Sequence, residues 1–438
     1  MSRPTFSHLF ITLSATLGLM ACSSGTSSSN TTPSNNTAVL SILPSSAMTE
    51  SIQYCQNNSG TDKPIFVNNI SNDGLIVGGT YAPATSMNFP EMVCGYRAFT
   101  TNGISLSLES MNSSVTLEGG DQEAYGSQIL SISNNNTLVG ELQFNPNGYV
   151  AAISLNNQLQ QIQPAIIPVP NVQADNAIAI NSNGTLLVGS YNGTYSPQSY
   201  IYDTESSQYF TPALNVENIE ASSLTSVSNN KIAVGGLKDT NGNFLGLICT
   251  TESCTTYTQD VNIDSTLVSI SESSQYIIGY QNDGTTTTPF YLFRNNGHNS
   301  VLNLEPDFTP FEHSLTNDGI TILAYNYPAN LEEAYYFYNP GTHDYYNAVD
   351  FINSLNLGIN TTDGDEFRIS GISNNGKYLY GHIKQASSIQ GLEAVTVPWR
   401  IYFPSGFTSA LESFQPANIK ALSKNLKDKK NVKTTFMQ

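Results

Sequence analysis

The sequence predicts an all-β fold, a seven-bladed β-propeller built from four-stranded antiparallel blades. Seven segments share one pattern: an apolar run, a turn rich in Asn, Asp and Gly, and a short strand that ends in Gly or Ala. An aromatic strand follows each of them, and their starts are 43 to 62 residues apart. Four strands per unit of roughly 40 to 50 residues is typical of a propeller blade. The segments begin at Ile70, Ile132, Ile180, Val227, Ile270, Leu315 and Ile372.

Residues 1–21 have the composition of an export signal, with Arg3 as their charged residue and an apolar run from Leu9 to Met20. The run ends in Leu-Met-Ala-Cys, which resembles the lipobox of bacterial lipoproteins. The resemblance implies that the leader is cut before Cys22, whose thiol then carries diacylglycerol. An ordinary secretory signal with an incidental cysteine is the alternative.

Residues 22–37 are rich in Ser, Thr and Asn and lack an apolar pattern, so we expect a flexible tether. Ser23, directly after the cysteine, implies an outer-membrane address by analogy with enteric bacteria. After the leader, no run of 18 apolar residues follows, so we expect the lipid to be the membrane anchor in the bacterial cell envelope. Residues 38–61 form an N-terminal segment. The alternating run from Ala38 to Leu43 predicts an outer strand where the ring closes.

The composition favours an acidic folded domain. The chain has 16 Lys and Arg against 34 Asp and Glu, a net charge of -18, and 39% hydrophobic residues, which suffice for a core. Phosphate binding needs a basic surface, so we expect no nucleic-acid partner. Six of the basic residues lie in the C-terminal tail, residues 414–438, which is either frayed or an amphipathic helix on a membrane or on the acidic propeller.

Within residues 62–413, each unit predicts the same hairpins. Asn-Gly and Asp-Gly turns need positive φ, which these residues tolerate. First strands that converge on an axis need a small residue before the apolar start. This position holds Asn69, Ser131, Ala179, Ser226, Ser269, Ser314 and Gly371. Apolar residues at helical spacing predict a short helix within Tyr346 to Leu357.

The units are similar to HAF-type extracellular repeats, in which Ile-Asn-x-x-Gly-x-x-Val-Gly precedes His-Ala-Phe and a Gly turn. INSNGTLLVG from Ile180 and ISNDGLIVG from Ile70 match the first half. Arg97, Ala98 and Phe99 match the second half except for the His, which every unit lacks. The resemblance spans residues 62–413 and implies an exported bacterial propeller with no particular reaction.

With Cys22 lipidated, four cysteines remain, an even number in an oxidising compartment. Three pairings are possible. Cys249 and Cys254 bracket a short turn between two β-rich runs, which favours a disulfide across one hairpin, and Cys55 with Cys94 follows by elimination. No His lies near these cysteines in the sequence, which disfavours zinc.

The sequence predicts no cofactor, no metal site and no nucleophile motif. Four histidines lie beyond the leader, and none are spaced as metal ligands. A calcium-loop pattern, with polar residues at every second position, is formed by Asp239, Asn241 and Asn243. However, Gly242 is not where a calcium loop has its Gly, and no closing Glu follows at the expected distance. We interpret this segment as a hairpin turn.

Charged residues interrupt the first strands of units six and seven. Glu312 and His313 lie in one, and Asp365, Glu366 and Arg368 in the next. Adjacent blades bring them to one mouth of the central channel, where a polar site binds ligands. A structural ion pair between Glu312 and Arg368 explains the same residues.

The leading functional hypothesis is a monomeric, lipid-anchored module without catalytic activity that binds a protein or glycan at the cell envelope. The alternative is a hydrolase or lyase that acts on envelope polysaccharide through the channel-mouth carboxylates. Two carboxyl groups in a deep pocket, at the distance of a catalytic pair, would favour the enzyme over the binding module.

Overall fold

The structure is a computed structural model, and the residues that it describes belong to one compact unit. The residues that it describes are 37–43, 65–81, 93–98, 109–110, 114–117, 120–123, 126–144, 148–154, 165–166, 168–169, 172–192, 197–211, 213–214, 219–258, 263–295, 298–325, 335–359, 367–386 and 394–417.

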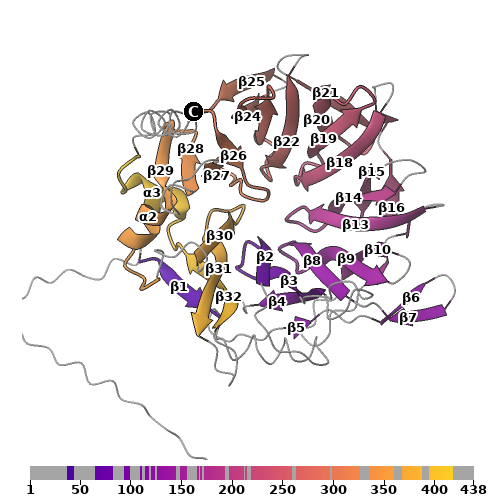
Figure 1. Ribbon diagram of the computed structural model, residues 1–438, viewed down its shortest axis with the longest axis horizontal. Helices are drawn as coiled ribbons and strands as arrows, with labels where there is room; N and C mark the ends of the chain where they lie inside the picture. Colours follow the sequence, from indigo (N-terminus) through magenta and orange to yellow (C-terminus); the bar gives the residue numbers. More distant parts are fainter. Residues whose placement is uncertain are drawn as a thin grey trace, which may run out of the picture. The chain divides into compact units, whose positions relative to one another are not determined.

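The described residues form a β-propeller with mainly four-stranded antiparallel blades, as the sequence predicts. There are seven sheets of four or five strands and one two-stranded ribbon, and Figure 1 shows the sheets placed around a central axis. We number the sheets 1 to 7 in the order in which their innermost strands occur in the chain.

Sheet 1 holds β2 (Ile65–Ile70), β3 (Ile76–Tyr81), β4 (Val93–Ala98) and β5 (Glu109–Ser110); the ribbon β6 (Ser114–Leu117) and β7 (Gly120–Glu123) follows. Sheet 2 holds β8 (Gly126–Ile132), β9 (Leu138–Phe144), β10 (Gly148–Ser154) and β11 (Ala165–Ile166). Sheet 3 holds β12 (Pro168–Val169), β13 (Val172–Ile180), β14 (Leu186–Asn192), β15 (Pro197–Asp203) and β16 (Gln208–Phe210).

Sheet 4 holds β17 (Ala213–Leu214), β18 (Ile219–Val227), β19 (Ala233–Asp239), β20 (Phe244–Cys249) and β21 (Ser253–Tyr257). Sheet 5 holds β22 (Asp264–Ile270), β23 (Tyr276–Asn282), β24 (Thr287–Asn295) and β25 (His298–Asn303). Sheet 6 holds β26 (Phe308–Pro310), β27 (Thr321–Tyr325), β28 (Tyr335–Asn339) and β29 (Asp344–Asn347). Sheet 7 holds β30 (Phe367–Ile372), β31 (Tyr378–Ala386) and β32 (Ala394–Tyr402).

The first described strand completes the last sheet. β1 (Val39–Ile42) pairs antiparallel with β32, with Val39 opposite Tyr402 and Ile42 opposite Trp399. It is the outer strand that the alternating run at residues 38–43 predicts. Because the two ends of the chain share one sheet, strand pairing ties the start of the propeller to its end.

The innermost strands approach the axis closely and carry a common irregularity. Six of them contain a register shift between the residues three and one positions before their last residue, for example between Leu224 and Ser226 of β18. Small residues follow the shift because side chains there meet the next sheet. The Ser226 hydroxyl accepts from the Ile270 backbone N–H at 3.3 Å, and Asn69 Nδ2 donates to the Ser131 hydroxyl at 2.9 Å.

Two short helices pack beside sheets 6 and 7. α2 (Ala348–Ser354) lies within the segment where the sequence predicts a helix, and Asn347 caps its first turn by accepting from the Asp350 N–H. α3 (Phe407–Glu412), which the sequence analysis did not predict, begins after Gly406, whose φ is +85°. Phe351 and Phe407 are buried side chains whose ring centroids lie 5.3 Å apart. The helices therefore add an aromatic core to this part of the ring.

No helix in the described residues has the length and hydrophobicity needed to cross a membrane.

Candidate functional site

The seven repeated turns, each between the innermost strand and its neighbour, have one geometry. In each, the fourth residue has positive φ and its N–H donates to the carbonyl of the first residue, at 2.8 to 3.2 Å. The sequence predicts this conformation from its Gly and Asn residues. The same conformation holds where the fourth residue is neither Gly nor Asn, at Lys231 and Ser274. The turns begin at Ser71, Ser133, Asn181, Ser228, Ser271, Thr316 and Ser373.

The second and third residues of these turns form what we call the polar belt. Each turn is hydrogen bonded to the next through a backbone N–H, and the seventh is bonded to the first. The donor and acceptor of each bond are Asn72 N–H and Asn134 Oδ1 (2.9 Å), Asn134 N–H and Ser182 O (2.7 Å), Asn183 N–H and Asn229 Oδ1 (3.2 Å), and Asn229 N–H and Glu272 O (3.1 Å). The ring continues with Glu272 N–H and Asn317 Oδ1 (3.0 Å), Asn317 N–H and Asn374 O (2.7 Å), and Asn375 N–H and Asn72 Oδ1 (2.9 Å).

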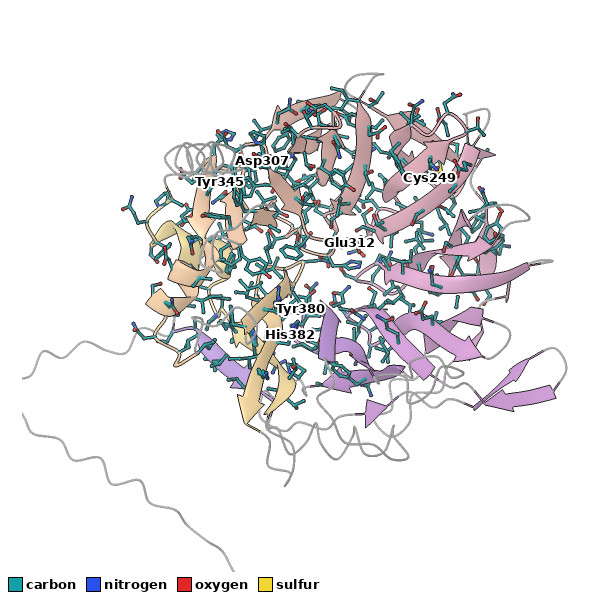
Figure 2. The ribbon with its side chains drawn as sticks, in the orientation of Figure 1. Cys249, Asp307, Glu312, Tyr345, Tyr380 and His382 are labelled. Atoms are coloured by element: carbon teal, nitrogen blue, oxygen red, sulfur yellow. A yellow bond between two sulfur atoms is a disulfide. The ribbon has the colours of Figure 1, made fainter. Side chains whose placement is uncertain are left out.

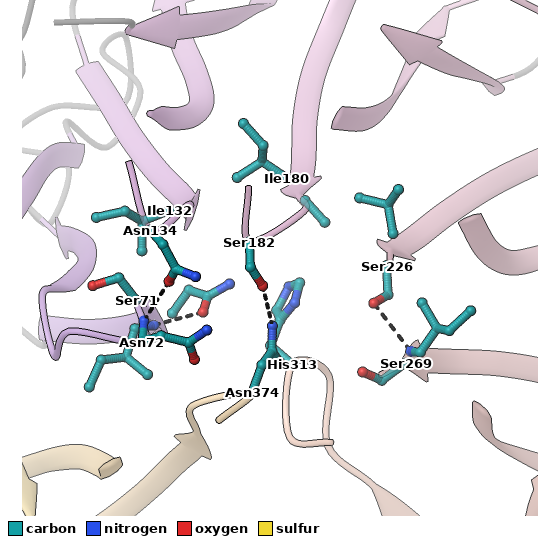
Figure 3. Close-up of a pocket in the computed structure, with 15 residues that line it drawn as sticks. Ser71, Asn72, Ile132, Asn134, Ile180, Ser182, Ser226, Ser269, His313 and Asn374 are labelled. Atoms are coloured by element: carbon teal, nitrogen blue, oxygen red, sulfur yellow. Dashed lines mark hydrogen bonds between the residues drawn. The ribbon is translucent and has the colours of Figure 1, made fainter. Parts of the chain in front are cut away.

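Two further hydrogen bonds cross the axis instead of following the ring. Asn72 Nδ2 of sheet 1 donates to Glu272 Oε1 of sheet 5 at 2.9 Å. Asn374 Nδ2 of sheet 7 donates to the Ser182 hydroxyl of sheet 3 at 3.2 Å (Figure 3). The polar belt therefore closes this end of the channel with side chains.

A small cavity lies under the polar belt. Its lining combines belt residues with the ends of the innermost strands, including Ile70, Ile180, Ser226 and Ser269. His313 also lines it (Figure 3). Its volume of about 20 Å³ has room for about one water molecule. Sites for drug-sized ligands are on the order of 300 Å³ or more, so this cavity does not hold a sugar or a peptide.

His313 reaches the channel because the innermost strand of sheet 6 is interrupted. β26 ends at Pro310, and the backbone of His313 adopts a left-handed conformation with φ of +54°. Burial lowers the pKa of the His313 imidazole, and the neighbouring Glu312 carboxylate partly offsets that effect. We therefore expect a neutral imidazole at pH 7.

Glu312 lies at the centre of the ring in Figure 2, and its side chain is exposed. Solvent therefore reaches the Glu312 side chain. The innermost strands end at the polar belt, so residues near their starts, such as Arg368 of β30, lie toward the opposite end of the ring. We call that end the open end.

Arg368 is exposed, and its Nη1 donates to the Tyr335 hydroxyl of sheet 6 at 3.4 Å. Tyr335 in turn stacks with Phe311, with ring centroids 5.7 Å apart. His382 of β31 lies directly opposite Arg368 in the strand pairing. Its Nδ1 is buried and has no hydrogen-bond partner. Burial, with a smaller contribution from the Arg368 charge, lowers the pKa of His382 to about 4.

Three of the residues that the sequence predicts to share one mouth lie in the described part of the chain. His313 lines the small cavity, and Glu312 and Arg368 are exposed. The alternative ion pair between Glu312 and Arg368 does not form. Among the described residues, the ion pairs join Lys231 to Asp203 at 3.3 Å and Lys238 to Glu220 at 2.9 Å. Asp365 and Glu366 lie outside the described residues.

Sequence reasoning missed His382 and the polar belt. The sequence gives no signal for His382, because the register shift between Ile369 and Gly371 is what places Arg368 opposite that residue. The signal for the belt is the second turn position, which is Asn in five of the seven turns.

The remaining motifs are structural. Asp239 accepts from the backbone N–H groups of Asn241 and Asn243, both at 2.9 Å, so the calcium-like segment is the hairpin turn that the sequence predicts. Cys249 and Cys254 form the predicted disulfide across β20 and β21. Cys22, Cys55 and the Cys94 side chain lie outside what the structure describes. No three His, Cys, Asp or Glu side chains gather as metal ligands in the described part of the chain.

No protein-family model matches the chain, and no curated protein matches it. Solved structures with a similar fold include a prolyl endopeptidase, at 12% identity and a TM-score of 0.41 over 63% of this chain. This chain covers 40% of that protein. The β-propeller domain of the Trilobed protease from Pyrococcus furiosus matches at 10% identity and a TM-score of 0.49, over 82% of this chain and 100% of that domain. Oligogalacturonate lyase from Vibrio parahaemolyticus matches at 10% identity and 0.45, over 84% and 97%. These similarities concern the fold alone.

Proposed function

We propose that this chain is a lipid-anchored β-propeller of the bacterial cell envelope that acts as a binding or scaffold module for a protein or a glycan. The observation that supports it is the polar belt, which links all seven turns and crosses the axis twice. A belt of this kind holds the sheets in fixed positions and closes one end of the channel. Ligand contact is then left to exposed charged residues such as Glu312 and Arg368, which form no ion pair with each other.

The proposal includes a closed ring of seven blades, one for each sheet, built from repeats of the HAF type. The hydrogen bonds from each turn to the next, including the bond from Asn375 back to Asn72, support this number. An experimental structure with six or eight blades, or with an open ring, contradicts it.

The anchor in this proposal is diacylglycerol on Cys22, with the outer membrane as the address and a monomer as the working form. Mass spectrometry of the mature protein tests the anchor directly. A lipid-modified N-terminus at Cys22 supports it, and an unmodified chain that starts elsewhere contradicts it.

Cross-linking in intact envelopes, followed by capture of the full-length acylated chain, tests the binding function. We expect a protein or glycan partner that the wild type captures and the double variant Glu312→Gln, Arg368→Gln does not. The matched control, Glu220→Gln with Lys238→Gln, removes one acid and one base from an exposed ion pair of sheet 4. Equal capture by all three chains places the binding surface elsewhere.

The alternative, a polysaccharide hydrolase or lyase, is tested on the same variants. Of the carboxylates that the sequence analysis proposed, Glu312 is within the described residues. Depolymerisation of envelope polysaccharide by the wild type, lost in Glu312→Gln, supports an enzyme and contradicts the binding module.

A further inference from the structure

Arg368 presents most of its hydrogen-bonding capacity to solvent. A guanidinium has five N–H donors, and one of them contacts the Tyr335 hydroxyl. No described carboxylate lies within ion-pair distance of Arg368, although the chain carries 34 Asp and Glu against 16 Lys and Arg. In such an acidic protein, an exposed Arg with no carboxylate partner among the described residues needs an explanation.

A second observation independently points to a ligand beside Arg368. The buried Nδ1 of His382 has no hydrogen-bond partner. Buried polar atoms of native proteins nearly always have a partner, and an orphan often marks a missing water, ion or ligand. His382 shares its side of the sheet with Arg368, because the two residues are directly paired across β30 and β31. The residue with the orphaned atom and the Arg368 guanidinium thus lie on the same side of the sheet.

Two aromatic rings lie beside the same guanidinium, the buried ring of Tyr335 and the partly buried ring of Phe311. The Tyr335 ring stacks with Phe311, with an interplanar angle of 28°. The Tyr335 hydroxyl accepts from Arg368, and no described residue accepts its own proton. A ligand at Arg368 therefore has a cation, a hydroxyl donor and the partly buried Phe311 ring within reach.

We propose that Arg368, Tyr335, His382 and Phe311 form a binding site for a sugar acid, with the ligand's carboxylate on the Arg368 guanidinium. The inference rests on the proposed function, because it names the ligand class for the open end of the ring. A guanidinium fork matches the two oxygens of a carboxylate, which gives two parallel charge-assisted hydrogen bonds. The Tyr335 hydroxyl and the Phe311 ring then contact the hydroxyls and apolar face of the sugar.

Binding of D-galacturonate, D-galactose and acetate to the full-length chain, measured by calorimetry, tests this site. We expect galacturonate to bind with a Kd on the order of 1 mM, and galactose and acetate to bind at least about tenfold more weakly. Arg368→Gln should weaken galacturonate binding by about tenfold or more, the usual effect of losing a charged hydrogen-bond partner. Arg368→Lys should bind galacturonate with an affinity between those of the wild type and Arg368→Gln, because an ammonium lacks the planar pair of donors that matches a carboxylate.

A second readout distinguishes binding from a structural role. A carboxylate beside Arg368 offsets its charge, so galacturonate should raise the pKa of His382 in an NMR titration of its ring protons. Arg368 on β30 is the charged group that faces His382. β32 places Pro398 opposite it, and β2, which packs against β31, has no titratable residue.

Arg294→Gln, the same change on β24 of sheet 5, is the matched control and should bind galacturonate like the wild type. Equal affinity for galacturonate and galactose, unchanged binding by Arg368→Gln, or acetate as tight as galacturonate overturns the proposal. Galacturonate binding without envelope capture supports this site and contradicts the proposed function. Envelope capture that persists without galacturonate binding contradicts this site and supports the proposed function.

Discussion

Asn72 and Glu272 are hydrogen bonded across the propeller axis, although 200 residues separate them in the chain. The Glu272 carboxylate accepts from Asn72 Nδ2 at 2.9 Å and from Asn317 Nδ2 at 2.6 Å. One side chain thus joins sheets 1, 5 and 6. The polar belt owes its closure across the axis to this contact and to the bond between Asn374 and Ser182.

Glu272→Ala should therefore destabilise the fold. It leaves two amide groups without their acceptor, and each charged hydrogen bond contributes about 1.5 to 3 kcal/mol. We expect a loss of roughly 2 to 4 kcal/mol in the free energy of unfolding, measured by chemical denaturation. Glu252→Ala, at an exposed turn, is the control and should change little. Equal stability of both variants contradicts a structural role for the belt.

Gly74→Ala should be more destabilising than the same change at a free turn. Gly74 has φ of +92°, and an added Cβ meets Arg400 Nη1 and, at 2.7 Å, Tyr378. Gly242 has φ of +89° with nothing within 4 Å, so Gly242→Ala carries the conformational cost of about 1 to 2 kcal/mol alone. We expect Gly74→Ala to lose about 1 to 3 kcal/mol more, seen in denaturant midpoints. Equal losses of stability in the two variants would show that sheets 1 and 7 move apart enough to accommodate the added Cβ.

Stability should fall as the pH is lowered from about 6.5 to about 4, partly through His382. Its pKa falls from 6.5 to about 4 on folding, so the unfolded chain binds more protons in that window and low pH favours unfolding. The contribution is at most about 3 kcal/mol. His382→Leu cannot titrate and should show a shallower pH dependence in thermal unfolding, whereas His343→Asn, in an exposed turn, should follow the wild type. Parallel curves for His382→Leu and the wild type contradict the shift.

Both cysteines of the Cys249–Cys254 disulfide are buried, but it closes a short loop. The chain-entropy estimate for such a loop is about 2 kcal/mol, so the double Ser variant should be less stable by roughly that amount and still fold. Unfolding curves of the oxidised protein and the variant measure the difference. A Cys55–Cys94 disulfide, with its longer loop, should contribute roughly 3 to 4 kcal/mol. Crossed pairs in non-reducing peptide mapping contradict both assignments.

The amino-acid sequence by itself determined the features that depend on neighbouring residues. Each turn is encoded within about five residues, by a Ser, Thr or Asn that accepts from the backbone and by a residue that tolerates positive φ. The edge strand at residues 38–43, the helix after Tyr346 and the hairpin disulfide also follow from short patterns. Their spacing and polarity fix local conformation before any long-range contact forms.

The tertiary structure alone decided which distant side chains meet. No sequence pattern places Asn72 beside Glu272, because that contact requires every intervening sheet to be in position. The position of His313 in the cavity likewise depends on the interrupted strand β26 and on its left-handed backbone. His382 lies beside Arg368 because the register shift between Ile369 and Gly371 moves the pairing by one residue. A one-residue shift exchanges the faces of a strand, so the site depends on packing that the local sequence does not encode.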